Sequence, residues 1–229
     1  MNILVIGAGG VGASMASIAE TRSFFAKFVL ADISFARAEE AVALLDDRSK
    51  FVAEQVDARD KEAIKSLISR VQADVVVNAC DPRLNEPIFD AAFESHCNYI
   101  DMAMNLSEPH ASNPYEEVGS PLGKDQLAAD EAWRERGLLA LVGMGVEPGL
   151  SDVFARYAAD NLFDTIDEIG VRDGSNLSID GLDFAPTFSI WTTIEECLNP
   201  PIVWEKNRGL YTTDCFSEPE VFHFPAGIG

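Results

Sequence analysis

The chain has 229 residues, 47% hydrophobic and 24% charged, which is the composition of an ordinary globular protein rather than of a disordered one. Its formal net charge of −21 disfavours nucleic acid and anionic membrane surfaces as partners, because both are bound mainly through Lys and Arg. The length predicts one large domain, or one domain with part of another.

The N-terminus and the cysteines bear on the cellular location. An apolar pentapeptide leads directly into glycines at the N-terminus, which favours a strand over a signal peptide. No run of about 18 apolar residues predicts a transmembrane helix. The four cysteines are far apart and form no CxxC pair, which is typical of reduced thiols. We therefore expect a cytoplasmic protein.

The first half of the chain alternates short apolar runs with helical patterns, which is typical of βαβ units and a parallel sheet. Apolar residues at helical spacing occupy the connections between these runs. The order predicts a doubly wound α/β domain over residues 1–150. Its expected strands are 2–6, 27–31, 51–55, 74–78, 98–101 and 138–142, and its expected helices are 11–20, 36–45, 61–71, 87–95 and 124–136.

The segment 108–123, which precedes the last of these helices, is rich in Pro, Ser, Asn and Gly. Such a segment is either a lid over a functional site or a surface insertion without a role. Both interpretations stay open from the sequence.

A second domain is expected from Ser151 to the end of the chain. The loop GMGVEPGLSD would be its hinge, and a helical pattern follows it. Residues 165–173, 185–193 and 220–224 are expected to be strands of an antiparallel sheet. We predict an α+β substrate domain over 151–229 that is truncated, because the chain stops just after an apolar strand.

The first expected strand ends in a glycine-rich turn, Gly7-x-Gly9-x-x-Gly12. Gly7 allows the tight turn, Gly9 lets the backbone approach a pyrophosphate, and Gly12 lets the helix pack closely on the sheet. The helix N-terminus favours phosphate through its free N–H groups and its dipole. Asp32 follows Gly12 by 20 residues, the place of a carboxylate that binds the adenosine ribose. A lone GxGxxG is weak evidence, but this context predicts a Rossmann dinucleotide-binding site.

The cofactor is expected to be NAD, because Asp32 would repel a 2′-phosphate; NADP is the alternative, since Arg37 would pair with one. Asp57 would reach the adenine, or else cap a helix. Asn78 and its neighbours lie where the nicotinamide ribose would sit, or else form an ordinary loop. The whole expected set is Gly7, Gly9, Gly10, Val11, Gly12, Asp32, Ile33, Arg37, Asp57, Ala58, Asn78, Ala79 and Cys80.

Several segments together resemble the saccharopine dehydrogenase family, which includes saccharopine reductase, lysine 6-dehydrogenase and carboxynorspermidine dehydrogenase-like members. They are GAGGVG, VLADIS, QVDARD, VVVNAC, NYIDMA and GMGVEPGLSD. The last is the most specific, because a G-x-G-x-[DE]-P-G loop follows the sixth strand in that family. Its matching residues are Gly143, Gly145, Glu147, Pro148 and Gly149. TFSIWTTIEECLNPPIVWEKNRG and FHFPAGIG resemble the family's second domain, although family members are considerably longer.

The resemblance implies an NAD(P)-dependent oxidoreductase acting on the C–N bond of an amino acid or polyamine-type amine. Hydride would pass between the nicotinamide and the carbon that bears the nitrogen, through an imine. The resemblance also implies a homodimer formed through the second domain. Asp101, Glu147 and Asp152 are the candidates for proton transfer. Loop hydrogen bonding for Glu147, and dipole stabilisation of a helix N-terminus for Asp152, are the alternatives.

Two other functions stay open. One is a homospermidine-synthase-like transferase in which NAD stays bound, and the other is a non-catalytic dinucleotide-binding module. Cys80 is interpreted as a lining residue, because no His pairs with it by motif. No metal is predicted, since the three histidines lack the spacing of ligands.

Overall fold

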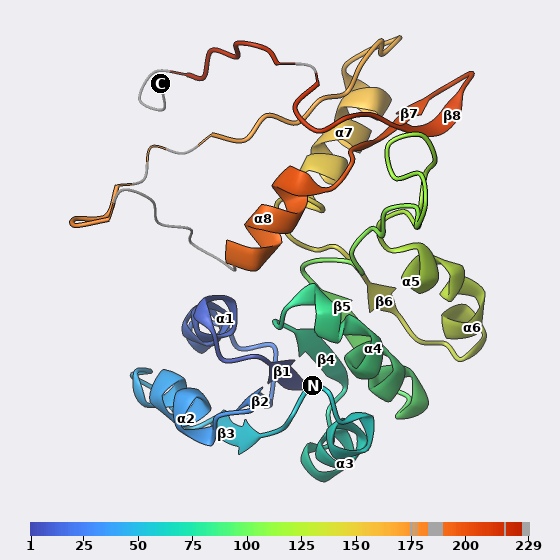
Figure 1. Cartoon of the computed structure of the whole chain (residues 1–229). Helices are drawn as coiled ribbons and strands as arrows, with labels where there is room; N and C mark the ends of the chain where they lie inside the picture. The colour runs from blue at the N-terminus through green and yellow to red at the C-terminus, as the bar shows by residue number, and fades with distance from the viewer. Residues whose placement is uncertain (175, 177, 183–189, 218, 226–229) are drawn as a thin grey trace. The chain divides into compact units, whose positions relative to one another are not determined.

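The computed structural model describes residues 1–174, 176, 178–182, 190–217 and 219–225 (Figure 1). Contacts divide the chain into two compact units. The first comprises Met1–Leu106 and Leu122–Leu150, and the second comprises Ser107–Pro121 and Ser151–Gly229. The Pro-rich segment Ser107–Pro121 therefore belongs, by its contacts, to the second unit.

The first unit is built on a six-stranded parallel sheet in the order β3-β2-β1-β4-β5-β6. The strand order reverses between β1 and β4, and ligands bind outside the carboxyl ends of strands at such a switch point. The doubly wound α/β fold predicted from the sequence is confirmed. The strands are β1 (Asn2–Ile6), β2 (Lys27–Asp32), β3 (Phe51–Gln55), β4 (Val75–Asn78), β5 (Asn98–Asp101) and β6 (Ala140–Leu141).

Two apolar cores lie on opposite faces of this sheet. Successive side chains of a strand point to opposite faces, so Ile3 and Val5 join one core while Leu4 and Ile6 join the other. Helices α1 and α2 cover the first core, and α3 and α4 cover the second (Figure 1). Their bounds are α1 (Gly10–Glu20), α2 (Phe35–Ala43), α3 (Lys61–Val71) and α4 (Asn85–Glu94), and a short turn η1 (Pro82–Leu84) precedes α4.

The helix expected over 124–136 is two short helices, α5 (Lys124–Ala128) and α6 (Asp130–Glu135). The N–H of Ala129 is shared between the carbonyls of Asp125 and Gln126, at 3.2 and 3.3 Å, which is typical of a helix terminus. Trp133 of α6 is buried against Phe89 of α4. The single continuous helix was therefore wrong, although its position along the chain was right.

The described part of the second unit contains two helices and a hairpin. Helix α7 (Leu150–Asn161) starts at the last residue of the first unit, and α8 (Ile190–Leu198) follows later in the chain. Strands β7 (Ile202–Glu205) and β8 (Gly209–Thr212) pair in antiparallel fashion. No helix among the described residues has both the length and the apolar composition needed to cross a bilayer.

The positions expected for the antiparallel strands were wrong. In the described residues, 165–173 and 220–224 form no strand. The expected strand 185–193 begins outside the described residues and is helical from Ile190 onward. In α8 the apolar residues Ile190, Ile194 and Leu198 recur every fourth position, as one face of a helix requires. A strand would also need a hydrogen-bonded neighbour. The two described antiparallel strands lie immediately after this helix.

Candidate functional site

A cavity of about 470 Å³ lies in the first unit at the carboxyl ends of its strands. Sites for small molecules and cofactors usually measure about 300 to 1,000 Å³. The lining comes from the turn after β1, the start of α2, and the loops after β3 and β4. It consists of Ile6, Gly7, Gly9, Asp32, Ile33, Arg37, Val56, Asp57, Ala58, Arg59, Ala79, Cys80, Asp81 and Leu84.

The glycines of the turn after β1 are required for two different reasons, close backbone packing and open space in the cavity. A Cβ on Gly7 would lie 2.5 Å from the carbonyl oxygen of Ala79, and one on Gly12 would lie 1.9 Å from that of Gly7. A Cβ on Gly9, in contrast, would meet no atom within 4 Å. Gly7 and Gly12 are therefore required by packing, whereas the absence of a side chain at Gly9 keeps the cavity open.

The carboxylate of Asp32 joins the glycine turn to the end of β2. Its Oδ2 accepts a 2.9 Å hydrogen bond from the N–H of Ala8, and its Oδ1 accepts one of 2.9 Å from Ser34. The side chain is only 7% exposed, and Nη1 of Arg37 lies 3.4 Å from Oδ1. Oδ2 has a second lone pair, so Asp32 keeps the capacity to accept a ribose hydroxyl.

A second Asp–Arg pair lies in the loop after β3. Nη2 of Arg59 donates to Oδ2 of Asp57 at 2.6 Å, and Nε donates to Oδ1 at 2.9 Å. This bidentate contact lowers the pKa of Asp57 to about 2. The sequence did not single out Arg59, although its position two residues after Asp57 at a strand end was a usable signal.

The loop after β4 contributes Cys80 to the cavity, and Asn78, the last residue of β4, does not line it. The Cys80 thiol donates to the carbonyl of Ile6 at 3.3 Å, and burial, with the charges of Asp32 and Asp81, raises its pKa to about 12. Asn78 is buried, and its Oδ1 accepts a 2.9 Å hydrogen bond from the N–H of Cys80. Cys80 is thus a neutral wall residue, and Asn78 shapes the loop that carries it.

The structure brings nine of the thirteen expected cofactor residues to the cavity wall and leaves Gly10, Val11, Gly12 and Asn78 off it. Among the five lining residues that the sequence did not name, the apolar ones could not be told from core residues by periodicity. Those five are Ile6, Val56, Arg59, Asp81 and Leu84.

Asp101, expected to be a proton-transfer residue, is 1% exposed and does not line the cavity. Its Oδ2 accepts a hydrogen bond from Gln126, and its Oδ1 accepts one from the N–H of Gly143, both at 2.7 Å. Burial raises the pKa of this carboxyl. These contacts hold the loop after β6 in place.

That loop carries Glu147, which is exposed and does not line the cavity. The loop closes on itself, because the N–H of Gly145 donates to the carbonyl of Pro148 at 3.0 Å. A Cβ on Gly149 would lie 2.4 Å from the carbonyl oxygen of Gly145, so the tight closure requires glycine there. Asp152, in the first turn of α7, is also exposed and belongs to the second unit.

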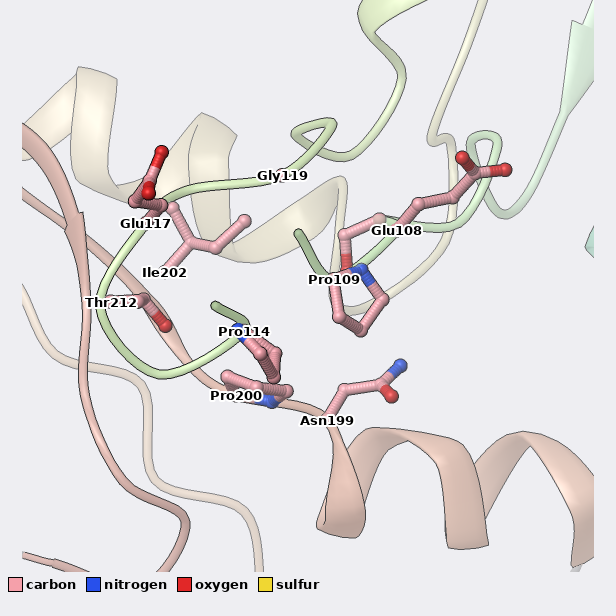
Figure 2. A pocket seen from close by; sticks show the side chains of 10 residues that line it. Glu108, Pro109, Pro114, Glu117, Gly119, Asn199, Pro200, Ile202 and Thr212 are labelled. Atoms are coloured by element: carbon pink, nitrogen blue, oxygen red, sulfur yellow. The ribbon is translucent and has the colours of Figure 1, made fainter. Parts of the chain in front are cut away.

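A smaller cavity lies within the second unit, between the 107–121 segment and the start of the β7–β8 hairpin. Figure 2 shows Pro109, Pro114 and Pro200 among its lining side chains. Its volume of about 10 Å³ holds about one water molecule. The segment itself is closed by two 2.9 Å backbone hydrogen bonds between Glu108 and Ser120. This cavity is therefore too small for an amine or a nucleotide.

Known proteins resemble the first unit in sequence along most of its length. Residues 3–141 match the model of the saccharopine dehydrogenase NADP-binding domain. The chain belongs to the saccharopine dehydrogenase family. Its first unit is the NAD(P)-binding domain of that family, so the family and an NAD(P) cofactor are confirmed, whereas the choice of NAD over NADP stays a prediction.

Curated relatives in this family extend the similarity into the second unit. The chain is 31% identical, over 98% of its length, to carboxynorspermidine synthase from Vibrio cholerae serotype O1. It is 28% identical, over 85% of its length, to carboxyaminopropylagmatine dehydrogenase from Synechocystis sp.. The matches cover 55% and 46% of those proteins, so the chain spans about half the length of these curated relatives.

A solved structure of apo saccharopine dehydrogenase (L-Glu forming) from Saccharomyces cerevisiae shares the fold. The match has a TM-score of 0.53 at 15% identity and covers 70% of this chain and 31% of that chain. The cavity fits the NAD(P) of this family, since Gly9 leaves open space beside the start of α1 and Asp32 faces the same cavity. No three His, Cys, Asp or Glu side chains gather as metal ligands within the described residues.

Proposed function

We propose that the protein is an NAD(P)-dependent oxidoreductase that acts on the C–N bond of a carboxylated polyamine. The observation that carries this proposal is a dinucleotide cavity at the switch point of the sheet, in a chain related along 98% of its length to a protein named carboxynorspermidine synthase. The carboxylated polyamine is inferred from the names of both relatives.

The bound nicotinamide would supply the hydride chemistry. Gly7 and Gly9 would let the pyrophosphate approach the N-terminus of α1, and Asp32 would accept a hydrogen bond from a ribose hydroxyl. The neutral thiol of Cys80 and the side chain of Leu84 would form the cavity wall beside the cofactor and exclude water from it.

We assign proton transfer at the amine nitrogen to Glu147, with Asp152 as the second candidate. Both carboxylates are exposed, and both lie in the segment that follows the sixth strand. Asp101 is assigned to positioning, because its two carboxylate oxygens already accept hydrogen bonds from Gln126 and Gly143. A carboxylate beside the imine would move the proton between nitrogen and water.

The distribution of charge supports a cationic substrate. Residues 151–229 contain fourteen Asp and Glu but only four Lys and Arg, whereas residues 1–150 contain twenty-four and thirteen. The density of net negative charge is thus nearly twice as high in the second part of the chain. A negative field attracts a polyamine and repels a substrate dominated by carboxylates.

The assembly and the location belong to the same proposal. Apolar side chains of the second unit are exposed on α7 and α8, among them Phe154 and Trp191. Large exposed apolar groups favour an interface, and the family resemblance makes a homodimer our expectation. A cytoplasmic location is proposed from the unpaired cysteines.

Absorbance at 340 nm with NAD⁺ or NADP⁺ and a panel of amines tests the activity. Carboxynorspermidine is expected to give reduced cofactor, whereas saccharopine and lysine give little. Formation of a transferred polyamine product without net reduction would replace the proposal with a transferase. A chain that binds cofactor but turns over no amine would contradict the proposal in favour of a binding module. Light scattering of the same sample would give twice the chain mass for a homodimer.

A further inference from the structure

Polar side chains form a buried network at the carboxyl ends of β4 and β5. Five Asp, Asn or Gln residues are buried in the described part of the chain, and four of them, Asn78, Asn85, Asp101 and Gln126, belong to this network. Tyr99, at its centre, is also fully buried. Every buried polar group needs a hydrogen-bond partner, and an apolar core would need none of these groups. The network therefore indicates a role beyond packing.

The register of the sheet brings its members together. Asn78 and Asp101 lie opposite each other as the last residues of β4 and β5. Tyr99 precedes Asp101 by two positions, and residues two apart on a strand share one face of the sheet. Nδ2 of Asn78 donates to the hydroxyl of Tyr99 at 3.1 Å and to Oδ1 of Asn85 at 2.7 Å. The Tyr99 hydroxyl in turn forms a side-chain hydrogen bond with the carboxylate of Asp101.

The two ends of the network hold backbone N–H groups of two different loops. Oδ1 of Asn78 accepts a 2.9 Å hydrogen bond from Cys80, in the wall of the dinucleotide cavity. Oδ1 of Asp101 accepts one of 2.7 Å from Gly143, at the start of the loop after β6. The Tyr99 hydroxyl connects these ends, because it is bonded to both Asn78 and Asp101.

We propose that Tyr99 is a positioning residue, whose hydroxyl fixes the loop of Glu147 relative to the cavity wall at Cys80. Asp101 connects the hydroxyl to that loop, and Asn78 connects it to the wall. The inference rests on the proposed function, because it takes Glu147 as the proton-transfer residue. It adds a buried group that touches neither cofactor nor substrate but holds the two walls between which they would react.

The phenol of Tyr99 is suited to such a link. Burial, together with the charge of Asp101, raises its pKa, so the hydroxyl keeps its proton and remains a donor. The rings of Phe89 and Trp133 lie 5.1 and 6.4 Å from the Tyr99 ring, centroid to centroid, and hold it in place. Tyr99→Phe therefore keeps the ring in its packing and removes only the hydroxyl.

Amide hydrogen exchange, resolved by NMR, tests the link in the chain itself. The amides of interest are those of Cys80 and Gly143, and Ala8 is the reference, since its N–H also donates to a buried carboxylate. Tyr99→Phe is expected to speed exchange at both amides about five- to tenfold more than at Ala8, because each acceptor loses a buried partner. Ile64→Val, a buried substitution on α3, is the control for general destabilisation and should affect the three amides alike.

Asn78→Ala is a second variant, which decides the matter if Tyr99→Phe does not fold. It should also speed exchange at Gly143, although the N–H of Gly143 donates to Asp101 and not to Asn78. Unchanged exchange at Gly143 in this variant would overturn the link. Acceleration at only one end of the network in Tyr99→Phe, or acceleration equal to that of the reference amide, would overturn it as well.

Turnover of carboxynorspermidine with NADP⁺, beside NADPH binding by fluorescence, tests the positioning role. Tyr99→Phe is expected to lower kcat about tenfold or more and to keep NADPH affinity within about twofold, because a misplaced catalytic group slows the chemical step. Ile64→Val should keep the wild-type kcat. A wild-type kcat in Tyr99→Phe would overturn the positioning role alone. A wild type that binds cofactor but turns over no amine would overturn the proposed function, and the positioning role with it.

Discussion

The side-chain amide of Gln126 donates a 2.7 Å hydrogen bond to the carboxylate of Asp101, and both side chains are buried. The oxygen Oε1 of Gln126 also accepts a 2.8 Å hydrogen bond from the N–H of Asn105. One amide thus joins α5, the end of β5 and the segment that follows it, while Asp101 holds the loop after β6 through Gly143.

Replacement of Gln126 by Ala is expected to lower the free energy of unfolding by about 1 to 3 kcal/mol, because the buried carboxylate of Asp101 loses a donor that nothing else replaces. Urea denaturation would measure the loss. Glu135→Ala is the control, since Glu135 is exposed on the nearby helix α6, and it should stay within about 0.5 kcal/mol of the wild type. Equal stability of the Gln126 variant would mean that the hydrogen bond contributes nothing net.

The raised pKa of Asp101 also predicts that the stability of the folded chain depends on pH. Burial raises the pKa of its carboxyl above the ordinary value of 3.8, so the folded chain holds this proton more tightly than the unfolded chain does. The resulting stabilisation is fully present below pH 3.8 and is lost as the pH rises through the raised pKa. Asp101→Asn removes this contribution, because an amide does not titrate in this range.

The free energies of unfolding of wild type and Asp101→Asn would therefore be compared at a series of pH values from about 4 to 8. The wild type is expected to lose stability relative to the variant as the pH rises. A difference that stays constant, or that changes in the opposite direction, would show that the pKa of Asp101 is not raised in the folded chain.

Local patterns predicted the strands and the glycine turn of the first unit well, but they did not reveal that the side chain of Asp101 is buried. The strands of a parallel sheet are apolar on both faces, so β1, β2 and β4 stood out as short apolar runs, and the Gly7 turn had a strand before it and a helix after it. The buried carboxylate of Asp101 is hydrogen-bonded to Gln126, which lies 25 positions away in the sequence. No local pattern contains such a contact.

In the second unit, the strands expected from the sequence were at the wrong positions. Its expected strands were chosen from apolar and β-branched composition, but a strand also requires a neighbour, which composition does not reveal. The hairpin formed instead where the turn between Glu205 and Gly209 brings two short segments together. Gly209 has φ +79, a conformation that glycine adopts without strain. The glycine at this position was therefore a usable turn signal in the sequence.

The thiols provide a test of the cavity wall. Cys80 has a pKa raised to about 12, so very little thiolate forms at pH 8, whereas the side chain of Cys197 is exposed. Iodoacetamide is expected to modify Cys197 much faster than Cys80, as peptide mass spectrometry would show. Saturating NADPH should slow Cys80 further and leave Cys197 unchanged. Rapid modification of Cys80 at neutral pH would contradict its placement as a partly buried, neutral wall residue.

Alanine substitutions at Gly9 and Gly12 are expected to have different effects, one on cofactor binding and the other on stability. In Gly12→Ala the new methyl would lie 1.9 Å from the carbonyl of Gly7, so the backbone must shift, and a loss of about 1 to 3 kcal/mol in unfolding free energy is expected. In Gly9→Ala the methyl meets no atom within 4 Å, and the backbone φ of −73° suits alanine. That variant should unfold at the wild-type temperature.

The methyl of Gly9→Ala would nevertheless occupy the space through which a pyrophosphate approaches α1. Its affinity for both NADH and NADPH should fall by about tenfold or more, and because the loss concerns the shared pyrophosphate, their ratio should stay that of the wild type. Titration by fluorescence, beside thermal unfolding, would measure both effects. Normal binding by a folded Gly9→Ala chain would show that the pyrophosphate does not pass over Gly9. A change in the ratio would place the methyl near the ribose instead.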